Sequence, residues 1–468
     1  SGCTKSSTQQ VTVRALPSAS FTAQSNTVCE GSSTNLLLNF TGSAPWTYSI
    51  NGLITATTSS SSVSIPVSPA TDSVFELTTL TDAHCSANSW REIAVGGLHM
   101  IGLKTNGTLW AWGGNFSGQL GVNDLVGRLK PVQVGTSADW LKIATGEAFS
   151  VALQKDGSLW TWGSNFYKEL GLNSTDLYKN TPQKILTSSG YKAITAGEKF
   201  GMAIKNDGSI WGWGLNIYGY LGNGSTTGYE IPTQSITGNW TSIAAGQEHS
   251  LGLKPDGTLW SWGKGTTGQL GRNVSVVSNL IPGQVGSSNN WMAIEAGADN
   301  SFGIMNDGTL WGWGWNQWGE LGTGDFFQQD SPQQAGTSTD WKSVALSNSS
   351  AVAIKQQGTL WGTGLNNHGQ LGNGGTLTQF GFAQSGTDNN WVQVAGGGSS
   401  GAAVKSDGTL WTWGRNGSGQ LGDGTTADRL APVQVNTPIS SVTITVNPLP
   451  EVSITGLPAI VCQGASPL

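Results

Sequence analysis

Apolar and polar residues alternate along most of this chain with the two-residue period of β-strands, and the alternating segments recur in units of about fifty residues. Each unit runs from an aromatic residue through two apolar stretches and a tight turn to a strand that ends in Trp-x-Trp-Gly. Long helical patterns are absent, so the pattern predicts an all-β chain. The units lie 49 to 51 residues apart and begin at Trp90, Trp140, Tyr191, Trp240, Trp291, Trp341 and Trp391.

The tight turn of each unit is an Asn-Gly or Asp-Gly pair, with Gln-Gly in the sixth unit. Between alternating apolar segments such a pair favours a two-residue hairpin turn in which both central residues take a positive φ. A loop ending in Gly-x-Leu-Gly follows, and then in six units a proline that we expect to open a fourth short strand. The turns are Asn106-Gly107, Asp156-Gly157, Asp207-Gly208, Asp256-Gly257, Asp307-Gly308, Gln357-Gly358 and Asp407-Gly408. The prolines are Pro131, Pro182, Pro232, Pro282, Pro332 and Pro432.

Four strands per unit, repeated seven times, bury their faces by packing blade against blade around an axis. The sequence therefore predicts a seven-bladed β-propeller over residues 89–439. The repeated pattern A-G-x-x-H-S followed by D-G-x-L-W-x-W-G-x-N-x-x-G-Q-L-G resembles the RCC1-type (regulator of chromosome condensation) repeat over residues 89–437. This resemblance implies the propeller fold and leaves the ligand open, because one fold serves many functions.

Charge narrows the range of partners. The chain carries 22 Lys and Arg against 28 Asp and Glu, a net charge of −6, and its basic residues are scattered. Phosphate binding needs a clustered positive field, so we expect no nucleic-acid partner. Eukaryotic members of the RCC1 family act in nucleotide exchange on a small GTPase and dock on chromatin, but this chain lacks a basic arm and we expect no GTPase partner. No apolar run of about eighteen residues is present, so no membrane span is expected.

The segments outside the repeats alternate like the strands of a small sandwich of immunoglobulin-like or PKD-like type. Val11 follows Cys3 by eight residues, and joining residue 88 to residue 440 places Ile444 at the same distance from Cys85. We infer that the propeller is inserted into the last loop of a sandwich formed by residues 18–88 and 440–447. Residues 1–17 and 448–468 are then the end of a preceding module and the start of a following one. Such strings of modules resemble bacterial surface proteins of the Bacteroidetes type.

Cysteine positions fit this plan. Cys29 and Cys85 lie early and late in the proposed sandwich, which makes them natural partners for one disulfide; the alternative is four free thiols. A disulfide implies an oxidising compartment, so we expect an extracellular or cell-surface location. Cys3 and Cys462 would belong to the neighbouring modules.

Candidate catalytic groups are few. The four histidines show no metal-ligand spacing, and neither a Gly-x-Ser-x-Gly elbow nor a phosphate-binding loop is present. We therefore expect no enzyme, no cofactor and no metal, with the turns at Asn123-Asp124 and Gly322 to Asp325 as weak calcium candidates. A cluster of His, Asp and Glu on the loops would support an enzyme instead. The histidines are His84 and His368, together with His99 and His249, which occupy a repeat position and are expected to be structural.

Binding is the function that the varying loop residues favour. The loops after the first strand and after Trp-x-Trp-Gly should share one face, since alternate connections of an antiparallel blade emerge at the same end. Trp315 and Trp318 stand out because, with Trp46, they are the only tryptophans outside the regular positions. An aromatic rim suits a protein hot spot or stacking on sugar rings, and the alternative is packing over neighbouring loops. The proposed ligand-binding residues are Phe116, Phe166, Tyr167, Tyr218, Trp315, Trp318 and His368.

We therefore predict a non-catalytic secreted or cell-surface module for recognition and adhesion that binds a protein or a glycan through this face. The alternative is a structural subunit of an extracellular fibre or surface layer, in which terminal half-modules of neighbouring chains pair. The sixth unit is irregular, which indicates either a decayed blade or the blade that a partner contacts. Its departures are Ser347 for Gly, Gln357 for Asp, Thr363 for the inner Trp and Phe382 for Pro.

Overall fold

The computed structural model describes residues 17–51, 53–82, 89–186, 189–273, 276–437 and 440–447. These residues form strands and turns, and none of them forms a helix. The chain divides into two compact units, Asn88–Thr437 and a second unit that combines Ser1–Ala87 with Pro438–Leu468. We call the first unit the ring and the second the flanking unit.

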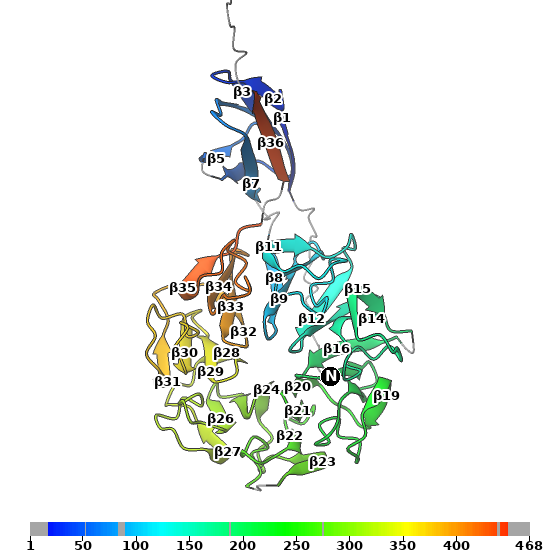
Figure 1. The fold of residues 1–468 in the computed structure, drawn as a ribbon. Coiled ribbons are helices and arrows are strands. Elements are labelled where there is room, and N and C mark those ends of the chain that lie inside the picture. Colours follow the sequence, from blue (N-terminus) through cyan, green and yellow to red (C-terminus); the bar gives the residue numbers. More distant parts are fainter. Residues whose placement is uncertain are drawn as a thin grey trace, which may run out of the picture. The chain divides into compact units, whose positions relative to one another are not determined.

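The ring consists of seven four-stranded antiparallel sheets arranged around one axis (Figure 1). Each sheet, or blade, is built from four strands that follow one another along the chain, with the first strand lining the centre and the last at the outer edge. The predicted four-stranded repeats of a propeller are confirmed. Blade 1 contains β8 (Trp90–Val95), β9 (His99–Lys104), β10 (Leu109–Gly113) and β11 (Arg128–Gln133); blade 2 contains β12 (Trp140–Thr145), β13 (Phe149–Gln154), β14 (Leu159–Ser164) and β15 (Tyr178–Lys184).

The remaining five blades repeat this order. Blade 3 contains β16 (Tyr191–Ala196), β17 (Phe200–Lys205), β18 (Ile210–Gly214) and β19 (Tyr229–Ile236); blade 4 contains β20 (Ser242–Ala245), β21 (His249–Leu253), β22 (Leu259–Lys264) and β23 (Ser278–Gln284). Blade 5 contains β24 (Trp291–Ala296), β25 (Asn300–Met305), β26 (Leu310–Gly314) and β27 (Gln329–Gln334); blade 6 contains β28 (Trp341–Leu346), β29 (Ser350–Lys355), β30 (Leu360–Gly364) and β31 (Gln379–Gln384). Blade 7 contains β32 (Trp391–Gly397), β33 (Ser400–Lys405), β34 (Leu410–Gly414) and β35 (Arg429–Gln434).

A buried tryptophan on the third strand joins each regular blade to the blade before it. In blade 2, Trp162 is fully buried and its Nε1 donates a hydrogen bond to the carbonyl oxygen of Gln119 at 2.9 Å. Burial of so large a ring together with a satisfied N–H makes this a strong link. The same bond is made, over 2.8 to 2.9 Å, by Trp112, Trp162, Trp213, Trp262, Trp313 and Trp413.

The ring closes where blade 7 meets blade 1. Strands β32 and β33 contact β8. Trp112 Nε1 donates to the carbonyl oxygen of Gln420 at 2.8 Å, and Trp90 N donates to that of Gly408 at 2.8 Å. The last and first blades are therefore linked by the same kinds of hydrogen bond that link other neighbouring blades. Among the described strands of the ring, each blade contains only strands of its own repeat.

The hairpin turns differ from the prediction. In blade 1 only Gly107 has a positive φ (+82°), while Asn106 does not, and the same holds for the other six turns. Lys104 N donates to Thr108 O and Gly107 N donates to Lys104 O, which makes a longer turn with a glycine bulge. The polar residue stabilises the turn through its side chain instead, because Asn106 Oδ1 accepts a hydrogen bond from Thr108 N at 3.0 Å. The expectation of two positive φ values per turn was wrong.

The repeated prolines lie inside the outermost strands and do not open them. Pro131 falls within β11, beside the register shift between Ala111 and Gly113 of β10. An edge strand at a register shift loses no ladder bond to proline, which is why this position tolerates it.

Blade 6 replaces the tryptophan link with two other side chains. Thr363 Oγ1 donates to Gly319 O at 2.8 Å, while Phe382 lies 4.8 Å from Trp341 and 6.4 Å from Phe302 between ring centroids. Phe382 belongs to β31, at the repeat position of proline in the other blades. The aromatic ring thus restores apolar contact at a joint where the usual indole is absent.

The flanking unit contains two sheets that share one core. One sheet holds β1 (Ser18–Ala23), β3 (Thr34–Thr41) and β6 (Ser62–Val67), and the other holds β2 (Thr27–Cys29), β4 (Trp46–Ile50), β5 (Ile54–Thr58), β7 (Ser73–Thr81) and β36 (Ser440–Asn447). Leu36 and Leu38 face Tyr48, Leu77 and Ile444 in the common core. Trp46, which the sequence set apart from the repeats, is buried in this core.

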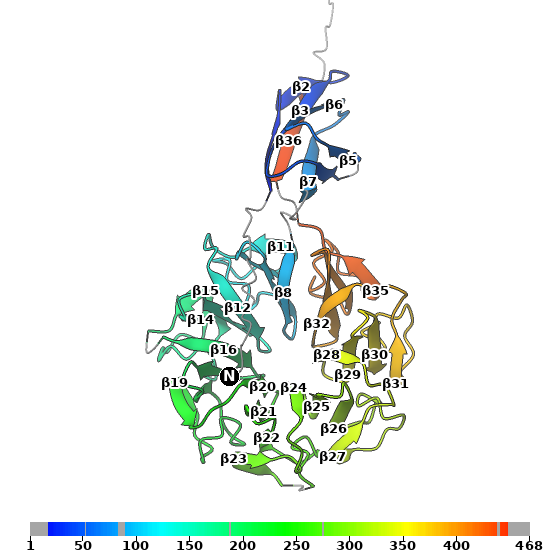
Figure 2. The ribbon, with the colours of Figure 1, turned by 180° about the vertical axis from the view of Figure 1, so that it is seen from behind.

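Strand β36 completes the second sheet after the ring has been traversed (Figure 2). It pairs antiparallel with β7, with Thr443 opposite Val74, and parallel with β2, with Thr27 opposite Thr445. The assignment of this sandwich to the immunoglobulin-like type stays a prediction. Cys29 is exposed and has a free thiol among the described residues, whereas Cys3, Cys85 and Cys462 lie outside them, so the proposed disulfide is not tested. The terminal half-modules over residues 1–17 and 448–468 also lie outside the described residues, apart from Pro17.

Candidate functional site

Two loops of each blade meet at one end of the ring, as the sequence predicts. The backbone N–H at the end of the third strand donates to a carbonyl of the loop that follows the first strand, for example Ser164 N to Ala148 O and Trp315 N to Asp299 O, both at 2.9 Å. The first loop and the loop between the third and fourth strands are therefore tied together in every blade. We call this end of the ring the loop face.

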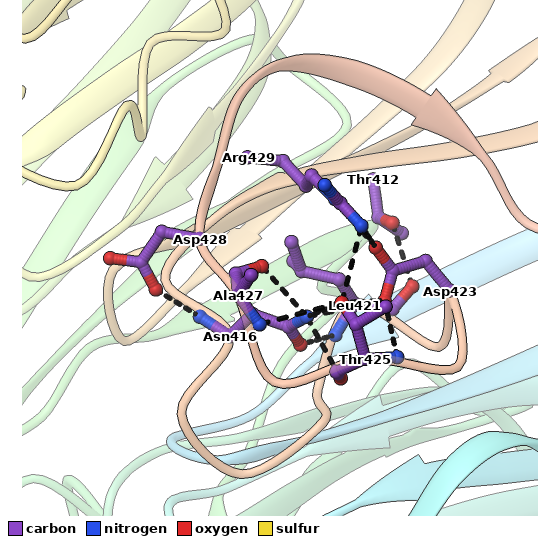
Figure 3. Close-up of polar contacts among 8 residues, drawn as sticks. All are labelled: Thr412, Asn416, Leu421, Asp423, Thr425, Ala427, Asp428 and Arg429. Carbon is purple, nitrogen blue, oxygen red and sulfur yellow. Dashed lines mark hydrogen bonds and ion pairs between the residues drawn. The ribbon is translucent and has the colours of Figure 1, made fainter.

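A buried asparagine holds the longer of these loops in shape (Figure 3). In blade 7, Asn416 Nδ2 donates to the carbonyl oxygens of Thr425 and Ala427, both at 3.0 Å, and its Oδ1 accepts from Leu421 N at 2.9 Å. Arg429 and Asp423 brace the same loop through an ion pair at 2.6 Å. Sequence reasoning missed this residue, although its recurrence in the repeat signals it. The equivalent residues are Asn115, Asn165, Asn216, Asn316 and Asn366, while blade 4 has Gly265.

A second buried side chain fixes the tip of the loop. In every blade but the third, the residue before Leu-Gly is Gln or Glu, and its side chain accepts a hydrogen bond from the backbone N–H two positions earlier. Glu320 Oε2 accepts from Trp318 N at 2.7 Å, and Glu169 Oε2 accepts from Tyr167 N at 2.6 Å. Burial raises the pKa of Glu320 to about 7. These bonds preorganise the backbone beneath the predicted aromatic residues, which lowers the entropy cost of presenting them to a ligand.

The predicted ligand-binding side chains lie on this face but do not form one patch. Phe116 and Phe166 are 77% and 65% exposed, and Tyr167, Trp315 and Trp318 are each about two-fifths exposed. Phe166 and Tyr167 contact each other edge to face at 5.0 Å. The full set is spread over blades 1, 2, 3, 5 and 6.

The other two predicted residues are held by neighbouring charges. Tyr218 is half-buried with Lys264 Nζ 5.6 Å from its ring centroid. His368 Nδ1 lies 2.7 Å from Asp428 Oδ2 of the next blade. Both side chains therefore contact neighbouring groups as well as presenting surface, and their role in ligand binding stays a prediction.

Three exposed phenylalanines that sequence reasoning missed lie near Trp318. Phe326 is 4.7 Å from Phe327 and 6.3 Å from Phe380 between ring centroids. Gly319, next to Trp318, packs so closely on Phe380 that a Cβ there would lie 2.6 Å from its Cα. We call Trp318, Phe326, Phe327 and Phe380 the aromatic group. The consecutive Phe326 and Phe327 in a loop were the signal available in the sequence.

Acidic residues mark the inner rim of the loop face on blades 2 to 5. Lys264 Nζ pairs with Glu248 at 2.6 Å and with Asp299 at 3.7 Å, and Glu198 pairs with Lys199 at 2.5 Å. Burial, and next the negative charge of Glu198, raise the pKa of Glu147. A pocket of about 220 Å³ lies beside this rim; its lining includes Tyr167, Lys199, Ile217, Tyr220 and Glu248.

The repeat histidines are structural, as expected. His99 and His249 are fully buried, and their Nε2 atoms lie 3.0 Å and 2.8 Å from the hydroxyls of Ser150 and Ser301 in the following blades. Burial lowers the pKa of each to about 3, so both are neutral. Neutral, buried imidazoles at blade joints position structure and offer no site for a ligand.

The carboxyl groups of the two calcium candidates already interact with charged or hydrogen-bonding groups of the protein. Asp124 pairs with Arg128 at 2.5 Å, and Asp325 Oδ1 accepts from Asn316 Nδ2 at 2.9 Å and from Phe327 N at 3.1 Å. Within the described part of the chain, no group of three or more His, Cys, Asp or Glu side chains could hold a metal ion. The same part contains no helix that is long and apolar enough to cross a membrane.

Family models match most of the ring. The RCC1-like domain model matches residues 191–448, and models of the regulator of chromosome condensation (RCC1) repeat match residues 90–119, 106–153, 140–169 and 156–204. The ultraviolet-B receptor UVR8 of Arabidopsis thaliana is 31% identical over 248 residues, which are 52% of this chain and 45% of that receptor. The match thus spans less than half of the receptor's length.

Solved structures share the fold of the ring. Human WBSCR16 and Prp20p from Saccharomyces cerevisiae both give a TM-score of 0.64 at 22% identity. They cover 71% and 72% of this chain and 95% and 87% of their own chains. Because the RCC1-like domain model alone matches more than half of the sequence, the chain belongs to the family of RCC1-like domain proteins.

Proposed function

We propose that this chain is a non-catalytic recognition module that binds a protein through the loop face of its ring. The observation that carries the proposal is the set of exposed aromatic side chains held on preorganised loops. Exposed rings on a rigid backbone provide large apolar contact area at low entropy cost, which is how protein hot spots are built. The buried asparagines and the Gln or Glu side chains supply the rigidity.

The family supports a protein partner. The structure of Prp20p is described together with its binding to Gsp1p and histones, and yeast RCC1 (Prp20) has been solved bound to Kap60. Those partners belong to those proteins. For this chain, the family supports the coarser statement that the propeller is a protein-interaction fold.

A glycan is the other ligand expected from the sequence, since sugar rings stack on exposed aromatic side chains. The aromatic group favours a protein, because it adds three phenylalanines, which offer no hydrogen-bonding group to a sugar hydroxyl. Display at the cell surface and adhesion stay predictions, which immunolabelling of intact cells would test.

The test is a protein microarray and a glycan array, both probed with the full chain. A Trp315→Ala, Trp318→Ala double variant should lose the protein signal while unfolding at an unchanged temperature, because both side chains are partly exposed. Met292→Ala is the matched control: it is an exposed apolar residue of blade 5 at the start of β24, away from the loop face. Signals only on the glycan array, or protein signals that survive the double variant, would contradict the proposal.

A further inference from the structure

The first strands of the seven blades surround a central channel of about 860 Å³. One position on these strands, four residues after the opening aromatic residue, contributes to the lining in every blade. In six blades it holds a small side chain: Ala94, Ala144, Thr195, Ala244, Ala345 and Ala395. Blade 5 carries Glu295 at this position. The channel therefore presents one carboxyl group in a layer of methyl and hydroxyl groups.

The carboxyl group of Glu295 has no partner within the described residues. It makes no hydrogen bond and no ion pair, and its burial raises its pKa to about 7. The other charged residues of the channel lining are Glu147, Glu198 and Arg415. Glu295 is half-buried and lines the channel. A carboxyl group without a protein partner, in surroundings that disfavour its charge, is a candidate to pair with a bound cation.

The lining indicates which chemical class fits. Calcium takes six to eight oxygen ligands, and one carboxylate supplies too few, whereas an ammonium group is well paired by a single carboxylate with further polar acceptors. Ile143, Ile194 and Ile243 line the same channel and provide contacts for an alkyl chain. At the loop end, Glu198 is paired with Lys199, and Glu147 is the carboxyl group that favours entry of a positive charge.

We propose that the central channel binds an alkylammonium group, whose charge is paired with the carboxylate of Glu295. The source of this group is either a small linear amine or the lysine side chain of a protein. The site goes beyond the proposed function, because neither Trp315 nor Trp318 lines the channel. A failure here therefore leaves the result of the loop-face arrays intact.

The experiment is isothermal titration of the full chain at pH 8 with three probes. Cadaverine represents a small amine, Nα-acetyl-lysine amide represents a lysine side chain, and 1-pentanol is an uncharged chain of similar length. One or both amines should bind and pentanol should not; the stronger amine identifies the source. Glu295→Gln should weaken amine binding by about tenfold or more, because the neutral amide loses the charge pair.

Two further variants keep the test decisive. Glu295→Ala places in blade 5 the residue that five other blades have, so it should fold and show the same loss. Glu320→Gln is the matched control: it makes the same chemical change in the same blade at a carboxyl group whose pKa is also raised to about 7, but which does not line the channel. Its amine affinity should equal that of the unaltered chain.

A pH series separates charge pairing from general binding. Glu295 must lose its proton to pair with an ammonium group, so amine affinity should be higher at pH 8 than at pH 6, and Glu295→Gln should remove most of this difference. On the strands that contact β24, namely β20, β21, β25 and β28, the ionisable residues are the buried, neutral His249 and the exposed Lys342. Equal amine affinity in Glu295→Gln, or no amine binding by the unaltered chain at millimolar concentrations, would overturn the proposal.

Discussion

The joint between blades 5 and 6 differs from the other six joints of the ring. Each of the six carries a buried indole whose N–H bonds the carbonyl of the preceding blade, as Trp313 does with Gln269. At the exceptional joint Thr363 takes the place of the indole and bonds Gly319 and Gln379 instead, and Phe382 comes from the outermost strand of the same blade to fill the space. A repeat can therefore keep its packing while moving the aromatic ring to another strand.

Blade 6 keeps the packing and the strands of a regular blade despite its irregular sequence. Phe382 packs against Phe302 and Trp341, and blade 6 keeps its four strands. The same joint carries the aromatic group on its surface and Glu320 beneath it, so the irregular packing and the exposed aromatic residues occur together.

The largest effect should come from a regular joint. Trp313→Ala removes a fully buried indole and its hydrogen bond, and should lower the free energy of unfolding by about 3–5 kcal/mol. Denaturant unfolding followed by tryptophan fluorescence measures it. Trp315→Ala, an exposed tryptophan two residues away, is the control and should change stability little. A small loss in Trp313→Ala would mean that the indole link is not what holds the blades together.

Phe382→Pro should have the next largest effect. Proline is the residue of the other blades at this position, and Phe382 makes no ladder bond, so the cost comes from lost aromatic packing, about 2–3 kcal/mol. Adding Thr363→Trp should recover most of this loss by rebuilding a regular joint. Thermal unfolding of the single variants and the double variant measures the coupling. Additive losses would show that the two residues do not compensate for each other.

Glu320→Gln should stabilise the joint in a pH-dependent way. Burial raises the pKa of Glu320 from its ordinary value of 4.5 to about 7, so ionisation is disfavoured in the folded chain. The stability of the unaltered chain relative to the variant should be constant below pH 4.5, fall between pH 4.5 and 7, and be lower by about 1–3 kcal/mol at pH 8. Denaturant unfolding at pH 4.5 and pH 8 tests this sign. A difference that does not change with pH would contradict it.

The smallest effect is expected for Thr363→Ala. The variant loses a hydroxyl whose single hydrogen can be donated to Gly319 O or shared with Gln379 O, but it keeps the packing of Phe382, so stability should fall by about 1 kcal/mol. Thermal unfolding of Thr363→Ala and Phe382→Pro under the same conditions shows which variant loses more stability. If Thr363→Ala cost more than Phe382→Pro, the hydroxyl and not the aromatic ring would be the main link at this joint.

Sequence reasoning found what depends on local periodicity. The alternation on either side of Asp-Gly, together with the fifty-residue recurrence of Trp-x-Trp-Gly, was sufficient for the strands and the blades. It misjudged the turn, because an Asp side chain that accepts from the backbone N–H two residues later, as Asp207 Oδ1 does from Ser209 N, removes the need for a second positive φ. That choice depends on side-chain geometry and not on residue type.

The site was harder to predict because it joins residues of different blades. Trp318 was identified as a tryptophan outside the repeat, but Phe380, sixty-two residues further on, comes close only because Gly319 packs against it in the folded ring. In the sequence, Glu295 resembles any charged residue on a strand. Its distinction is visible only in the folded ring, where the six equivalent residues that line the channel are Ala or Thr. The buried Asn416 recurs in six of the seven blades, so its recurrence in the sequence could have identified it.

The pairing of β36 with β7 and β2 has a mechanical consequence. If the chain were stretched between its first and last described residues, the load would pass from β1 through the flanking unit to β36. The ring lies between β7 and β36 along the chain, so it would bear no tension until the β36 pairings had separated. The flanking unit thus acts as a mechanical shield, and a pulling experiment should record its rupture before any blade unravels.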